Sequence, residues 1–140
     1  MEIILYRMRS NRLYTEGELF INGDRATFTV ESTDRMLPVG LYSLALIKRS
    51  ARKQRLAIQG THHSGRGYWT VRAGNSYISA RKRQAIIIGD PLIPGVVYHS
   101  RFLFDRLISR LTKCRERGET ISFEISEARC RQTQPIGQWL

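Results

Sequence analysis

The stretch GELFINGDRATFTVE, residues 17–31, predicts a β-hairpin and with it a β-rich fold. Asn22 and Gly23 lie at its centre, and this pair suits a tight turn in which both residues have positive φ. The residues after the turn alternate between apolar and polar types. We expect a buried face made of Ala26, Phe28 and Val30, and a wet face made of Arg25, Thr27 and Thr29.

Further strands are predicted on both sides of this hairpin. Residues 3–6 read as a strand, and residues 41–47 alternate with Tyr42, Leu44 and Leu46 on one face. Short apolar strands follow at 56–58, 68–72 and 85–89, and Ile121, Phe123 and Ile125 mark a last strand. The basic residues 48–55 read as a connection, and residues 90–95 read as a loop fixed by two prolines.

One long helix is predicted near residues 100–117. Leu103, Leu107, Leu111 and Cys114 recur at helical spacing, Ser100 is the expected N-cap, and Gly118 the expected stop. The fold class is therefore mainly β (α+β): a single compact antiparallel β domain with one helix, in the C-terminal half, packed on it. We expect this globular domain to cover residues 1–128 and residues 129–140 to form a loose tail.

The length and composition favour a single-domain protein without a membrane span or a disulfide framework. With 140 residues, the chain has the size of one domain. It contains no apolar run of about 20 residues and no signal peptide, so we expect synthesis in the cytoplasm and no membrane span. The two cysteines make no disulfide framework, and His62, His63 and His99 lack metal-ligand spacing. We predict neither a metal nor a cofactor.

The positive charge is concentrated in the middle of the chain. The formal net charge is +11, and the segment between Asp34 and Asp90 contains 11 lysines and arginines and no acidic residue. Like charges repel unless an anionic partner relieves them. The expected partner is an anionic polymer or an acidic protein in an assembly.

The stretch VRAGNSYISARKRQAIIIG, residues 71–89, lies in this basic segment and reads as a strand, a Gly-Asn turn, a basic run and a second strand. The turn and the cations suit an anion-binding surface, and nearby aromatic rings could add stacking faces. The candidate binding residues are Tyr68, Arg72, Gly74, Asn75, Tyr77, Arg81, Lys82 and Arg83.

Several motifs stand in a suggestive order: TVES at 29–32, LPVGLYSL at 37–44, VRAGNS at 71–76, AIIIG at 85–89 and SRFLFDRL at 100–107. Over roughly residues 1–112 the chain resembles a family of small bacterial and phage domains of unknown function. That family carries a His-x-Gly-Asn strand end and a Gly-Cys strand, which are similar to the motif of L,D-transpeptidases. In those enzymes a cysteine thiolate attacks a peptide carbonyl, and a histidine accepts its proton.

The resemblance implies a scaffold that has lost this chemistry. Gly74 and Asn75 match the Gly-Asn pair, but Arg72 stands in the place of the histidine and Ala85 in the place of the cysteine. Arginine stays protonated and cannot act as a general base, and alanine has no nucleophile. We therefore expect no catalytic residues at these positions.

Three functions remain open. The first is a catalytically silent binding or structural domain, a pseudoenzyme, with a virion or mobile-element setting that the resemblance implies. The second is a peptidoglycan enzyme, L,D-transpeptidase-like or an amidase, which would need Cys114 or Cys130 beside a histidine. The third is a nucleic-acid-binding protein, because a basic block with aromatic residues suits phosphate contacts and base stacking.

Overall fold

The computed structural model describes residues 1–50, 53–59 and 69–127. In chain order the elements are β1 (Glu2–Ser10), β2 (Tyr14–Ile21), β3 (Asp24–Ser32), β4 (Gly40–Ser50), β5 (Lys53–Gln59), β6 (Trp69–Ala73), α1 (Tyr77–Arg83), β7 (Ala85–Ile93), β8 (Val96–Tyr98), α2 (Ser100–Glu116) and β9 (Ser122–Glu127). The predicted tail over 129–140, Tyr68, His62, His63 and Cys130 lie outside the described residues.

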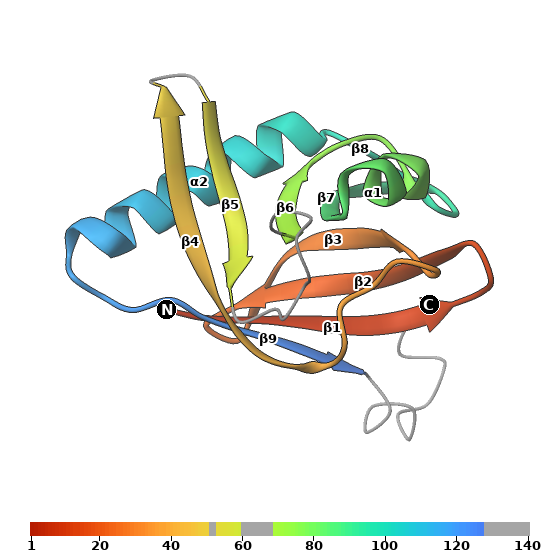
Figure 1. The fold of residues 1–140 in the computed structure, drawn as a ribbon, viewed down its shortest axis with the longest axis horizontal. Coiled ribbons are helices and arrows are strands. Elements are labelled where there is room, and N and C mark those ends of the chain that lie inside the picture. Colours follow the sequence, from red (N-terminus) through yellow and green to blue (C-terminus); the bar gives the residue numbers. More distant parts are fainter. Residues whose placement is uncertain (51–52, 60–68, 128–140) are drawn as a thin grey trace.

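The strands form a closed barrel in the order β3-β2-β1-β9-β4-β5-β6-β7, which β7 closes by pairing with β3, and β8 pairs with β7. In the described part of the chain, the β1–β9 and β6–β7 pairs are parallel and the remaining pairs are antiparallel. The prediction of a mainly β domain with a helix packed on it is confirmed (Figure 1).

The barrel interior and the inner face of α2 form the main core. Leu44 and Leu46 of β4 and Phe123 and Ile125 of β9 are buried, as their alternation predicts. Phe104, Leu107 and Leu111 of α2 pack into the same cluster, and Cys114 is buried on the same helix face. The helix stripe is confirmed, and α2 covers the side of the barrel near β6 and β7 (Figure 1).

The predicted hairpin is confirmed, but its buried face is only partly correct: Val30 is buried as predicted, and Phe28 is half-buried. Asn22 and Gly23 have φ of 50° and 90°, as their turn requires. Yet Thr27 and Thr29 are buried, whereas Ala26 is exposed. A register irregularity opposite Leu19 and Phe20 shifts the alternation, and α1 covers the outer face of β3, so both faces of this strand lose solvent.

A buried ion pair lies among the apolar side chains. Arg7 of β1 donates from Nε and Nη2 to the two carboxylate oxygens of Glu31 at 2.9 and 2.8 Å. Both side chains are less than a tenth exposed. The bidentate geometry satisfies the guanidinium and the carboxylate at once, which a buried charge needs.

The basic run after the Gly-Asn turn is a helix, which the sequence did not predict. Ser76 begins α1 by accepting a hydrogen bond from the Ile78 amide at 3.2 Å, and Gln84, at φ 50°, ends it. The helix connects β6 to β7, and these two strands lie next to each other as a parallel pair. The segments predicted as a basic connection and a proline-fixed loop are largely strand, because β4 and β5 form a long hairpin and β7 continues to Ile93.

The predicted N-cap of the long helix is also wrong. His99, at φ 57°, occupies the cap position of α2 and makes no side-chain cap hydrogen bond. Ser100 instead donates its hydroxyl to the carbonyl of Ile88 and accepts from the Gly74 amide at 2.9 Å. These two bonds fix the start of α2 beside the end of β6 and the middle of β7.

Among the described helices, none combines the length and the apolar character that a membrane crossing requires.

Candidate anion-binding cleft

A cleft of about 1010 Å³ lies between α2 and the strands β5 and β6. Its floor is apolar and is made of Leu56, Val71 and Phe104, with Ile108 at the side. Its charged lining consists of Arg55, Arg72, Arg83, Arg101 and Lys113, against two acidic residues, Asp105 and Glu116. Positive charge therefore dominates a hollow with an apolar base.

Two of these arginines face each other across neighbouring strands. Leu56 of β5 pairs with Val71 of β6 in antiparallel register, and Arg55 and Arg72 are the next residues outward on the same two strands. Like charges at opposed positions of an antiparallel pair are destabilising. The strand pairing thus brings together two cations that repel each other.

The other two arginines come from the helices. Arg83 is the last residue of α1, which is held at the edge of β6 by a hydrogen bond from the Thr70 amide to the Gln84 carbonyl at 3.3 Å. Arg101 is in the first turn of α2, directly after Ser100. Four separate elements therefore supply one arginine each to the cleft.

Among the residues that the structure describes, no acidic group pairs with Arg72. Partial burial lowers the pKa of Arg72, and the guanidinium groups of Arg83, Arg55 and Arg101 lower it further. Among the ion pairs of the described residues, Arg101 with Asp105 at 3.9 Å is the one that involves these four arginines. Such an exposed pair contributes little, so the cleft keeps an excess of positive charge.

Uncharged polar side chains complete the lining. They are Gln54, Thr70, Ser109 and Thr112. The Gln54 Oε1 and Thr70 Oγ1 atoms are buried and have no hydrogen-bond partner within the described structure. A buried polar atom without a partner is costly, so these two positions mark where the cleft wall lacks an interaction.

The structure brings only some of the predicted binding residues together. Arg72 and Arg83 both line the cleft. Arg81 instead pairs with Asp34, at 3.0 Å between Nε and Oδ2, and Lys82 is exposed outside the cleft. The predicted convergence of Arg72, Arg81, Lys82 and Arg83 is therefore limited to the first and the last of these residues.

The turn residues and Tyr77 have packing roles. A Cβ at Gly74 would lie 2.8 Å from the Cδ1 of Ile87, so this position has no space for a side chain. The Asn75 carbonyl accepts from the Val97 amide at 2.9 Å, and the Tyr77 ring packs on Tyr14 at 5.6 Å. Tyr68 lies outside the described residues.

Arg55 and Arg101 were missed as site residues. Arg55 lies in the segment 48–55 that the sequence predicts as a basic connection, and Arg101 lies in the predicted long helix near 100–117. The available signal for Arg55 was the block itself, which contains no acidic residue to pair with it. Nothing local in the sequence links Arg101 to Arg72, because α2 reaches β6 only through the tertiary fold.

No family model, curated protein or solved structure matches the chain. The cleft must therefore be interpreted from its own chemistry.

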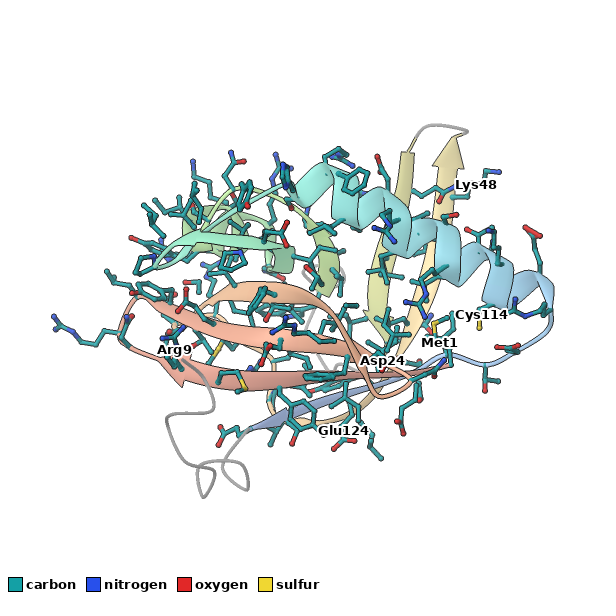
Figure 2. The ribbon with its side chains drawn as sticks, turned by 180° about the vertical axis from the view of Figure 1, so that it is seen from behind. Met1, Arg9, Asp24, Lys48, Cys114 and Glu124 are labelled. Atoms are coloured by element: carbon teal, nitrogen blue, oxygen red, sulfur yellow. The ribbon has the colours of Figure 1, made fainter. Side chains whose placement is uncertain are left out.

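The two positions that the transpeptidase motif would use lie in different surroundings. Arg72 lines the cleft, whereas Ala85 is 1% exposed and packs with Val30, Ala80 and Ile87. The described thiol, that of Cys114, lies near Met1 (Figure 2) and donates to Glu119 at 3.3 Å. Burial raises the pKa of Cys114, and the hydrogen bond with Glu119 raises it further.

Within the described residues, Cys114 has no histidine nearby. His99 precedes the other end of the same helix and contacts Asp90 at 3.3 Å. The two residues are fifteen positions apart, which corresponds to about 22 Å at a helical rise of 1.5 Å per residue. A thiolate–histidine pair therefore does not form between these two residues.

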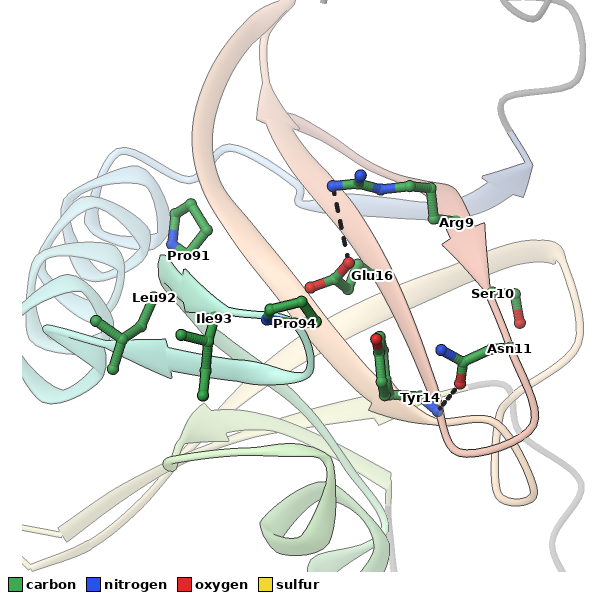
Figure 3. A pocket seen from close by; sticks show the side chains of 9 residues that line it. All are labelled: Arg9, Ser10, Asn11, Tyr14, Glu16, Pro91, Leu92, Ile93 and Pro94. Carbon is green, nitrogen blue, oxygen red and sulfur yellow. Dashed lines mark hydrogen bonds and ion pairs between the residues drawn. The ribbon is translucent and has the colours of Figure 1, made fainter.

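A second hollow, of about 660 Å³, lies between the β1–β2 turn and the β7–β8 hairpin (Figure 3). Its walls include Tyr14, Leu92 and Ile93. Glu16 accepts from the Gly95 amide at 3.1 Å and pairs with Arg9 at 3.8 Å, so the charges of this hollow compensate each other. The cleft beside α2 is the better candidate site, because three of its four arginines have no acidic partner among the described residues.

Proposed function

We propose that this protein is a catalytically silent binding domain that engages an anionic polymer or acidic partner through the cleft beside α2. The observation that carries the proposal is a group of four arginines, Arg72 and the three around it, of which all but Arg101 lack an acidic partner among the described residues. An arrangement that repels itself in the free protein gains stability when an anion enters. The setting in a virion or mobile element rests on the family resemblance alone.

The arginine side chain suits this role. Its planar guanidinium donates two parallel hydrogen bonds to carboxylate, sulfate or phosphate oxygens, and it keeps its charge at any working pH. The apolar floor of the cleft excludes water from part of the contact, which strengthens such bonds. The same two properties would serve nucleic-acid phosphates, which makes nucleic acid the alternative ligand.

The enzyme alternative finds less support. Arg72 cannot accept a proton, Ala85 is buried without a nucleophile, and Cys114 is hydrogen-bonded to Glu119. A peptidoglycan hydrolase or transpeptidase assay on the purified protein, with and without a thiol-modifying reagent, tests it directly. Thiol-dependent activity would contradict the binding-domain proposal.

The test of the proposal compares two double variants with the same change in net charge. Arg72→Gln/Arg83→Gln removes two cations from the cleft, and Lys82→Gln/Arg110→Gln removes two exposed cations outside it. We expect the first to weaken binding to heparin by more than about tenfold, because charge-assisted hydrogen bonds contribute about 1.5–3 kcal/mol each. The second should have a much smaller effect.

Fluorescence anisotropy with labelled heparin at several salt concentrations provides the measurement. The cleft variant should also show a flatter dependence on salt, since fewer counterions are exchanged. Equal losses in the two double variants would mean that net charge, and not the cleft, determines binding. That result would refute the proposed site.

A further inference from the structure

We infer that the ligand of the cleft is a glycan chain bearing sulfate or phosphate esters, and that side chains of α2 bind its hydroxyl groups through hydrogen bonds. This inference rests on the proposed function and specifies the class of ligand. It follows from three properties of the cleft: the arginines that can bind an oxyanion, the lack of a stacking platform among the described lining residues, and the hydrogen-bonding side chains on the cleft side of α2.

The oxyanion seat lies at the strand end of the cleft. Arg55 and Arg72 each lie next to the Leu56–Val71 pair of β5 and β6, and the charges of Arg83 and Arg101, from the two helices, also act on Arg72. Guanidinium groups that converge from several directions match the several oxygens of a sulfate or phosphate ester better than a single planar carboxylate. The cleft is therefore built for a tetrahedral oxyanion at this end.

The described lining offers no aromatic face for a nucleic-acid base. Phe104 is the aromatic residue of the described lining, and it is only 5% exposed. The guanidinium of Arg101 also lies over its ring, 5.8 Å from the centroid. Proteins that bind single strands gain about 1–3 kcal/mol per base from stacking on exposed rings. This contribution is absent from the described cleft, which disfavours a nucleic-acid ligand.

The opposite wall has the character of a sugar-binding surface. Asp105, Ser109, Thr112 and Glu116 follow one another at helical spacing along the cleft side of α2. Thr112 donates its hydroxyl to the Ile108 carbonyl at 2.8 Å, which leaves its lone pairs free to accept. The acceptors on this wall suit hydroxyl groups. Its two carboxylates would repel phosphate and sulfate alike, so the ester groups of the glycan belong near the arginines and its hydroxyl groups along α2.

The experiment uses calorimetric titration of the full chain with three probes at one ionic strength. The probes are a short heparin-derived oligosaccharide, inorganic polyphosphate and oligothymidylate of similar charge. We expect the oligosaccharide to bind at least about tenfold more tightly than oligothymidylate, because only the sugar chain has hydroxyl groups for α2.

A double variant that changes no charge separates the sugar contacts from the charge contacts. Ser109→Ala/Thr112→Val should weaken oligosaccharide binding about tenfold, as expected for two lost hydrogen bonds, and change polyphosphate binding less than about twofold. If the double variant fails to fold, Ser109→Ala alone provides the test, because Ser109 is exposed and should give about a threefold loss.

The two proposals fail in different ways. If Arg72→Gln leaves the binding of every probe unchanged, the proposed function is wrong and this inference falls with it. If Arg72→Gln weakens every probe but oligothymidylate binds as tightly as the oligosaccharide, only the glycan inference is refuted. An equal effect of the Ser109 and Thr112 changes on all three probes would refute it as well.

Discussion

Replacing Arg72 by glutamine should stabilise the free protein. Arg72 is half-buried, faces Arg55 across the strand pair, and feels the charges of Arg83 and Arg101 without an acidic partner among the described residues. The repulsion is largest from Arg83, then from Arg55 and Arg101. A close like-charge pair costs about 0.2–1 kcal/mol, and solvent screening keeps the remaining repulsions small. The variant should therefore gain about 1 kcal/mol at low salt.

For a chain of this length, about 1 kcal/mol corresponds to a rise of about 3 °C in Tm. Differential scanning calorimetry at about 20 mM salt measures this shift. At 1 M salt the Debye length is about 3 Å, so the gain should largely vanish. Lys82→Gln, an equal charge change at an exposed position of the same segment, should shift Tm by less than half as much.

Two results would refute this reasoning. A lower Tm for Arg72→Gln would mean that the arginine makes a stabilising contact that outweighs its repulsion. A gain of the same size at low and high salt would mean that the effect comes from packing and not from charge. Saturating anion should reverse the order, because it stabilises the wild-type protein and much less the variant.

Other substitutions probe separate features. Glu31→Gln leaves a buried guanidinium without a counter-charge and should lower the free energy of unfolding in urea by about 3 kcal/mol. Hydrogen bonds from Ser32 and then from Arg81 lower the pKa of Asp34, so its stabilising contribution is present above the usual carboxyl pKa of 3.8 and is lost as the pH falls further. The Tm difference between wild type and Asp34→Asn should therefore disappear in that acid range. Cys114, in a variant whose other cysteine is serine, should react with a thiol reagent at pH 8 far more slowly in the native protein than in urea, because the side chain is buried and its pKa is raised.

Strands with one solvent-exposed face were predictable from the sequence. Leu44 and Leu46 face the core while Ser43 faces solvent, so the alternation of β4 is visible in the residues themselves. In β3 the same reasoning fails, because α1 and the barrel interior bury both faces. Thr29 at 2% exposure and Val30 at 1% are adjacent residues that point in opposite directions.

The helix α1 escaped prediction for a different reason. Of its residues only Ala80 is buried, so no apolar stripe marks a helical period. The remaining local signals were Ser76, a residue type that favours the N-cap, and the good helix formers from Ala80 to Arg83. A helix that buries a single small side chain shows no hydrophobic pattern from which it could be predicted.

Two of the four arginines that line the cleft were predictable from the sequence. The basic block pointed to Arg72 and Arg83, but the site is completed by Arg55 and Arg101, which are 46 residues apart in the sequence. Their proximity depends on the register of β5 against β6 and on the bonds of Ser100 that fix α2. The strand register and these hydrogen bonds belong to the tertiary structure, and local residue types and spacing do not specify them.

The position of β9 also determines when the barrel can close during synthesis. This strand lies between β1 and β4, and the Met1 amine donates to the Thr120 carbonyl at 2.8 Å. β1 therefore cannot pair with β9 until more than a hundred further residues have been translated. Until β9 leaves the ribosome, β1 and β4 each present an unpaired edge, which invites pairing with other nascent chains.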